Sequence, residues 1–115
     1  MSKKSQIIFD VQVDENKVPT NIKWSASDSD KGSSSATLIS IWEAETQNTL
    51  KLDLWTKDMK VDEMNLFFYQ TLLTMSETFG RATSNESLSK DLKDFADYFG
   101  RKSKVITGEN TNSSS

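Results

Sequence analysis

The 115-residue sequence contains no cysteine and no histidine, and these two absences exclude several kinds of site. Without cysteine there is no disulfide framework, no thiolate metal ligand and no cysteine nucleophile. Without histidine the chain lacks the usual general base and the commonest zinc ligand. Glycine and proline are scarce, with four and one residues, and no glycine-rich phosphate-binding motif is present. The composition therefore predicts that the protein is not an enzyme and holds no cofactor or metal.

Long apolar runs and an excess of positive charge are also missing. The apolar run Ile7-Ile8-Phe9 ends at Asp10, and no segment approaches the roughly 20 apolar residues of a membrane span. We therefore expect neither a signal peptide nor direct membrane insertion. The net charge of −3 disfavours nucleic-acid binding, because a nucleic-acid binder needs a basic surface to displace counterions from phosphates. The sequence thus predicts a cytoplasmic protein without a nucleic-acid partner.

Most of the large apolar side chains lie in residues 49–79, and we expect the rest of the chain to be organised around this stretch. Leu50, Leu52 and Leu54 alternate with other residues, which is the period of a strand with two unlike faces. From Val61 the spacing changes to three or four residues, which predicts a helix over 61–81. The members of that apolar stripe are Val61, Met64, Phe68, Leu72, Met75 and Phe79.

The residues before this stretch predict three further segments. Alternating apolar residues on both sides of a polar turn indicate a β-hairpin over residues 5–26. The serine-rich residues 27–35 are expected to form a flexible surface loop. Residues 37–44 suit either a buried strand or a short helix, and the β-branched residues Thr37, Ile39 and Ile41 favour the strand.

A second helix is predicted after Gly80, which suits the C-terminal cap of the first. Thr83 and Glu86 have the spacing of a capping box, and the apolar residues Leu88, Leu92, Phe95 and Phe99 repeat at helical spacing up to about residue 102. The short connection requires the two helices to be antiparallel. The predicted fold class is α+β, with a four-stranded antiparallel meander and a C-terminal antiparallel helical hairpin packed on one face. We expect residues 1–103 to form a single domain and residues 104–115 to form a disordered tail.

The same central stretch carries a family resemblance. The run TLKLDLWTKDMKVDEM, followed by FFYQTLLTM, resembles the signature of the GldC family of gliding-motility proteins of Bacteroidota. The segments DENKVP and DFADYF, with Trp24 and Trp42, also lie where that family's pattern places them. The resemblance does not extend to residues 27–35 or to the tail after Arg101. It implies a non-enzymatic accessory protein of the gliding apparatus, with protein components of that apparatus as partners. The resemblance also implies a place in the cytoplasm or beside the inner membrane through such a partner.

The densest acidic run consists of Asp53, Asp58, Asp62 and Glu63. Paired carboxylates can perform acid–base chemistry or hold a divalent ion. Here lysines are interleaved with them and histidine is absent, so we interpret them as solvated charges and as helix N-terminal acids that interact with the helix dipole. No catalytic, cofactor-binding or metal residue is predicted.

The aromatic residues are the better candidates for function, because large aromatic side chains anchor protein interfaces. The side chain of Trp55 points to the sheet face opposite to that of Leu50, Leu52 and Leu54, because successive residues of a strand alternate between the two faces. Trp55 therefore either packs under a loop or helix end or projects from the outer face of the sheet. The hypothesis is a protein-binding surface consisting of Trp42, Trp55, Phe67 and Tyr69, with Lys57 and Asp58 as its polar rim. The alternatives are a homo-oligomeric structural module and, third, a domain that binds a small ligand or metal. The sequence leaves open which sheet face is exposed.

Overall fold

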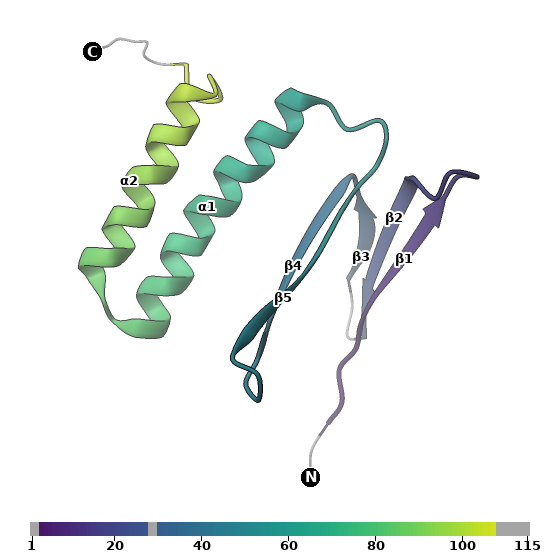
Figure 1. Ribbon diagram of the computed structural model, residues 1–115, viewed down its shortest axis with the longest axis horizontal. Coiled ribbons are helices and arrows are strands. Elements are labelled where there is room, and N and C mark those ends of the chain that lie inside the picture. The colour runs from purple at the N-terminus through teal and green to yellow at the C-terminus, as the bar shows by residue number, and fades with distance from the viewer. Residues whose placement is uncertain (1–2, 28–29, 108–115) are drawn as a thin grey trace. The chain divides into compact units, whose positions relative to one another are not determined.

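The computed structural model describes residues 3–27 and 30–107 (Figure 1). Part of the predicted serine-rich loop, residues 28–29, and residues 108–115 of the predicted tail lie outside the described residues. The chain consists of two compact units, Met1–Met59 and Lys60–Ser115. The first contains the strands and the second contains the helices.

The first sheet has three antiparallel strands in the order β1-β2-β3, which are β1 (Ile7–Val13), β2 (Pro19–Ala26) and β3 (Lys31–Ser34). In its register, Phe9 lies opposite Trp24 and Val11 lies opposite Ile22. The predicted alternation is therefore real, because apolar residues of both strands share one face. Ile22 is fully buried on that face. The predicted hairpin over residues 5–26 is confirmed.

Strand β3 corrects the prediction of a loop through residue 35. Ile22 pairs with Ser34, and Trp24 pairs with Gly32. A Cβ atom on Gly32 would lie only 3.0–3.2 Å from the indole atoms of Trp24, so the absence of a side chain makes room for the ring. No apolar alternation marks this strand, because it contributes small residues next to the large side chain of Trp24.

The second sheet is the antiparallel hairpin of β4 (Ala36–Glu43) and β5 (Asn48–Trp55), so the predicted strand over residues 37–44 is confirmed. The expected four-stranded meander is wrong, because the described residues form five strands in two sheets. The chain bends at Ser35, between a strand paired with β2 and a strand paired with β5. The Ser34 and Thr37 hydroxyls lie 2.9 Å apart across this bend. Local hydroxyl bonds of this kind compete with a continuous ladder.

The two helices are α1 (Val61–Thr83) and α2 (Glu86–Lys102), which lie side by side and antiparallel (Figure 1). Both predicted helices are confirmed, with ends that agree to within about two residues. Small residues form the contact between them. The Ser89 hydroxyl donates to the Ser76 carbonyl at 2.6 Å, and Ser76, Ala96 and Gly100 are buried.

Gly80 is part of this contact and not the predicted C-terminal cap. A Cβ atom at Gly80 would lie 2.8 Å from the Ser89 hydroxyl oxygen. The cap is Ser84, which has a left-handed φ of 58° and donates its N–H to the Gly80 carbonyl at 2.9 Å. Helix–helix packing therefore requires a residue without a side chain at this position, a constraint that the local sequence does not display.

The predicted start of α2 is also wrong by two residues. The N-cap is Asn85, whose side-chain oxygen accepts from the Leu88 N–H at 3.1 Å. The Thr83 hydroxyl instead donates to the Phe79 carbonyl at 2.8 Å, which keeps Thr83 within α1. Thr83 and Asn85, two positions apart, both have capping chemistry, and the length of α1 leaves Asn85 as the cap.

The helical hairpin has two unlike sides. Helical spacing places the apolar stripes of both helices on one side of the pair, at roughly 90–100° from the line of contact. Phe68, Met75 and Phe95 of these stripes are exposed. The opposite side carries the ion pairs Lys90–Asp94 and Lys93–Asp97. Packing of the apolar side on a sheet stays a prediction.

The residues after α2 turn back over the helix pair. Ile106 donates its N–H to the Gly100 carbonyl at 2.9 Å. A Cβ atom at Gly100 would lie 2.6 Å from Ile106 Cδ1 and 2.8 Å from Tyr69 Cε1, so both side chains pack directly on this glycine. Residues 104–106, which we assigned to the tail, therefore contribute to the packing of the helical unit.

Candidate interaction surfaces

The β4–β5 hairpin carries two tryptophans on one face. In its register Trp42 lies opposite Thr49 and Trp55 lies opposite Ala36, so both indoles are on the same side at opposite ends of the hairpin. Trp42 is 63% exposed and Trp55 is 53% exposed. This tryptophan face also contains Leu38, Ser40, Thr49, Lys51 and Asp53. Of the two alternatives for Trp55, projection from the sheet is the one that the structure shows.

The opposite face of the same hairpin is apolar. This leucine face contains Ile39, Ile41, Leu50, Leu52 and Leu54. Leu50 and Leu52 are 49% and 50% exposed, so they are only partly covered. A two-stranded hairpin is marginally stable by itself in water, because it can bury little apolar surface. Further burial of the leucine face would therefore stabilise the hairpin.

Beside Trp55 the surface is hollowed. The hollow has a volume of about 250 Å³ and is lined by Lys17, Val18, Pro19, Asp53, Leu54 and Trp55. Val18 comes from the turn between β1 and β2 and Pro19 begins β2, whereas Trp55 ends β5. Its walls combine an indole with aliphatic groups and one charge of each sign. An apolar side chain of a partner protein would fit this chemistry.

An ion pair fixes the turn that borders the hollow. Lys57 Nζ lies 2.9 Å from Asp14 Oδ2, and Asp14 Oδ1 accepts the N–H groups of Asn16 at 2.8 Å and Val18 at 3.0 Å. The Lys57 hydrogen bond, with help from the Val18 N–H, lowers the pKa of Asp14 to about 2. The same bond raises the pKa of Lys57. Lys57, which we predicted as a rim residue, therefore positions Val18 next to Trp55.

Asp14 was missed as a contributor to this site. The sequence DENK indicated only a turn, and a turn does not reveal which distant cation its carboxylate binds. A backbone hydrogen bond also joins Lys57 to this part of the chain, since the Lys57 N–H donates to the Pro19 carbonyl at 3.0 Å. The predicted rim residue Asp58 is exposed and follows directly.

The remaining predicted contact residues belong to the helical unit. Phe67 is half-buried and meets Phe68 edge to face, with ring centroids 6.1 Å apart. Tyr69 packs on Gly100 in the contact between the helices. The structure therefore brings Trp42, Trp55, Lys57 and Asp58 into one unit and places the other two in the second unit.

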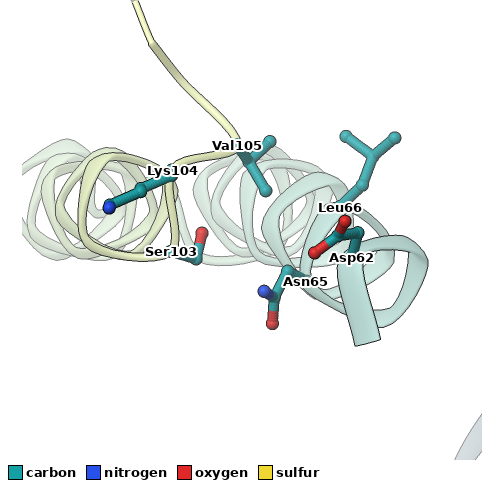
Figure 2. A pocket seen from close by; sticks show the side chains of 6 residues that line it. All are labelled: Asp62, Asn65, Leu66, Ser103, Lys104 and Val105. Carbon is teal, nitrogen blue, oxygen red and sulfur yellow. The ribbon is translucent and has the colours of Figure 1, made fainter. Parts of the chain in front are cut away.

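The helical unit has a hollow of its own at the end where α1 begins and α2 finishes (Figure 2). Its volume is about 450 Å³, and its lining is Asp62, Asn65, Leu66, Ser103, Lys104 and Val105. Figure 2 shows the Lys104 ammonium group pointing away from the Asp62 carboxylate. The charged groups do not converge on a common point, so the hollow shows no catalytic arrangement.

The acidic run has ordinary structural partners. Asp53 lies 3.4 Å from Lys51 Nζ, and the Glu63 carboxylate accepts the Lys60 N–H at 2.9 Å at the start of α1. Across residues 3–27 and 30–107, no three or more acidic side chains come together as a metal site would require. Within the same ranges, neither helix combines the length and apolar character needed to span a bilayer.

Comparison with known proteins assigns the chain to a protein family. Residues 19–105 match the family model described as "Gliding motility-associated protein GldC-like", and the match includes residues 27–35, which the resemblance in sequence had left out. No curated protein and no solved structure matches the chain. Because the matched residues make up well over half of the sequence, the chain belongs to the GldC-like family of gliding motility-associated proteins.

Proposed function

We propose that this protein is a non-enzymatic accessory protein of the bacterial gliding-motility machinery that binds another protein of that machinery through its tryptophan face. Family membership supports the process. The observation that supports the mode of action is the pair of exposed indoles, Trp42 and Trp55, on one face of the β4–β5 hairpin. Exposed tryptophans of this kind are typical anchors of protein interfaces.

The surroundings of Trp55 favour a preorganised contact. The Asp14–Lys57 ion pair and the Lys57–Pro19 backbone bond hold the wall of the hollow before any partner binds. A rigid site loses less conformational entropy on binding than a mobile one. Trp55 with its hollow is therefore the proposed centre of the interface, and Trp42 is a second anchor at the far end of the face.

The partner would be a protein component of the gliding apparatus. We propose that the chain acts in the cytoplasm, or at the inner membrane when such a partner holds it there. Phe67 contributes only if the helical unit also contacts the partner, and Tyr69 serves the packing of the helices.

The test is affinity purification of the tagged full-length chain from its native cells after mild cross-linking. Recovery of a motility protein should be lost in Trp55→Ala and reduced in Trp42→Ala, with the far-ultraviolet circular dichroism unchanged. Tyr98→Ala is the matched control, because Tyr98 is 52% exposed but lies on α2. Undiminished recovery by a folded variant that lacks both Trp42 and Trp55 would show that the tryptophan face is not the interface.

A homo-oligomeric structural module is the second candidate function. The supporting observation is the partial exposure of the leucine face and of the apolar stripes on the helices. Exposed apolar surface of this extent usually marks an association site. Sedimentation equilibrium over a range of concentrations distinguishes this candidate, since a structural module would show self-association without any other protein.

A further inference from the structure

Strand β5 has an outer edge with which no strand of the described residues pairs, although the end of β5, from Asp53 to Trp55, shares the hollow with Lys17, Val18 and Pro19. Within the described chain its ladder partner is β4 alone. The Thr56 N–H donates to the Ser35 carbonyl at 2.8 Å, so the even-numbered positions of β5 direct their backbone groups toward β4. The odd-numbered positions direct theirs outward, as Lys57 does when it donates to Pro19. Thr49, Lys51 and Asp53 therefore present outward-facing N–H and C=O groups.

The side chains along this edge are accessible. Residues 48–53 are all exposed. An unpaired strand of alternating leucines is a template for another strand, and proteins commonly block such edges with charged residues. Here the two charges, Lys51 and Asp53, are of opposite sign and two positions apart. This arrangement gives no net attraction to a strand of uniform charge, but it is complementary to its own sequence running in the opposite direction.

We propose that β5 pairs antiparallel with β5 of a second copy of this chain, about a two-fold axis that passes through Leu52. In this register Lys51 lies opposite the second copy's Asp53, and Asp53 lies opposite the second copy's Lys51. On the leucine face, Leu50 lies opposite the second copy's Leu54. Odd positions meet odd positions, so the outward backbone groups of both strands form the hydrogen bonds of the new ladder.

Other registers are less favourable. An axis through Lys51 or Asp53 places like charges directly opposite each other, which is destabilising. An axis through Leu50 pairs Lys51 with Thr49 and leaves no ion pair. An axis through Leu54 sets Lys51 against the second copy's Lys57, whose N–H already donates to Pro19. The axis at Leu52 is the one that joins both charges of each copy to opposite charges.

The product is a continuous sheet in the order β4-β5-β5-β4, with the leucine faces of the two copies joined. Four strands with one apolar face have the size that a two-stranded hairpin lacks. The Lys51–Asp53 pairs lie on the tryptophan face of this sheet and the leucine pairs lie on the other face. The inference concerns pairing along the edge of β5, so it goes beyond the proposed partner contact and does not depend on it.

The charge pattern provides the first test, by sedimentation equilibrium of the full-length protein at low salt. The wild type should form dimers, and Lys51→Glu should weaken the dimer about tenfold, because two like-charged pairs replace two ion pairs. The double variant Lys51→Glu/Asp53→Lys restores the complementarity and should recover the wild-type dissociation constant. Trp42→Ala should leave the dimer unchanged, because Trp42 lies on β4 and not on the pairing edge, which separates this result from the partner test.

Because the chain has no cysteine, single cysteines can report the register. Leu52→Cys places two thiols at the two-fold axis, where the Cα atoms of a non-hydrogen-bonded pair lie about 4.5 Å apart, within the range of a disulfide. Leu50→Cys is the matched control on the same face, since its two thiols would be four residues out of register, or about 13 Å apart. Oxidation should give a cross-linked dimer for the Leu52→Cys variant only.

Three results would overturn the proposal. The first is a monomer at every concentration with no cross-link at position 52. The second is a dimer that neither charge variant changes, which would place the interface elsewhere. The third is equal cross-linking of the Leu50→Cys and Leu52→Cys variants, which would show that the strands do not pair in a fixed register.

Discussion

The ammonium group of Lys57 lies 2.9 Å from a carboxylate oxygen of Asp14, across a separation of 43 residues in the sequence. The contact joins the turn between β1 and β2 to the segment that follows β5. It thereby connects the two sheets of the strand unit at the border of the hollow beside Trp55. The arrangement of the proposed binding site depends on it.

This ion pair predicts an acid-dependent loss of stability. The pKa of Asp14 is lowered from 3.8 to about 2 in the folded chain, so the unfolded state binds the proton more readily. The contribution is fully present above the unfolded pKa and is lost as the pH falls from about 4 through about 2. Wild type and Asp14→Asn should therefore differ in their urea midpoints at pH 7 and converge near pH 2. A difference that persists unchanged at pH 2 would contradict this assignment.

Substitution of Gly100 tests the packing of the helical unit. Gly100→Ala should lower the free energy of unfolding by about 1–3 kcal/mol, because overpacking costs more than the helix propensity of alanine returns. The new methyl group would meet Ile106 and Tyr69. Urea unfolding measures the change. Adding Ile106→Ala should reduce the cost of Gly100→Ala without abolishing it, because Tyr69 Cε1 would still lie 2.8 Å from the new methyl group. An equal cost in both backgrounds would exclude Ile106 as a neighbour that clashes.

Removal of the α2 cap tests the assignment of Asn85. Asn85→Ala should lower the free energy of unfolding by about 1 kcal/mol, because the Leu88 N–H loses its side-chain acceptor. The control is Ser87→Ala, an exposed substitution within the first turn of the same helix. Thermal unfolding followed by circular dichroism compares the two. The assignment is wrong if both variants unfold at the same temperature as the wild type.

The three tryptophans should differ in their access to solvent. Trp24 packs on Gly32, whereas Trp42 and Trp55 project from the β4–β5 hairpin. In variants that keep one tryptophan and carry phenylalanine at the other two positions, acrylamide should quench Trp42 and Trp55 several times more strongly than Trp24. Equal quenching of all three would mean that the tryptophan face is covered in the isolated protein.

The sequence predicted the elements whose periodicity is strong and local. The alternation in β1, β2 and β5 and the three-to-four spacing in α1 each identify one apolar side, so these elements were placed correctly. Strand β3 was not predicted, because its contribution is a glycine that makes room for the Trp24 ring. A single missing side chain leaves no periodic pattern in the sequence. The division into two sheets was missed for a similar reason, since it follows from one bend at Ser35.

The candidate site was predictable only in part. Parity placed Trp55 on the face opposite the leucines, and the structure bears this out. The role of Lys57 was not predictable, because its partner Asp14 is 43 residues away in the sequence and only the fold brings the two side chains together. Tyr69 was predicted to belong to the protein-binding surface, but in the structure its ring packs on Gly100 of α2.

The glycines of this protein have a consequence for reading its relatives. The four left-handed residues of the described chain are Lys17, Gln47, Ser84 and Lys104, and none of them is glycine. The described glycines instead stand where a neighbouring side chain approaches the backbone. When distant members of the family are aligned, a shared glycine should therefore be taken as the mark of a packing contact, and the turns should be located by their polar residues. An alignment that matched glycines to turns would shift the helices against one another and displace the tryptophan face with them.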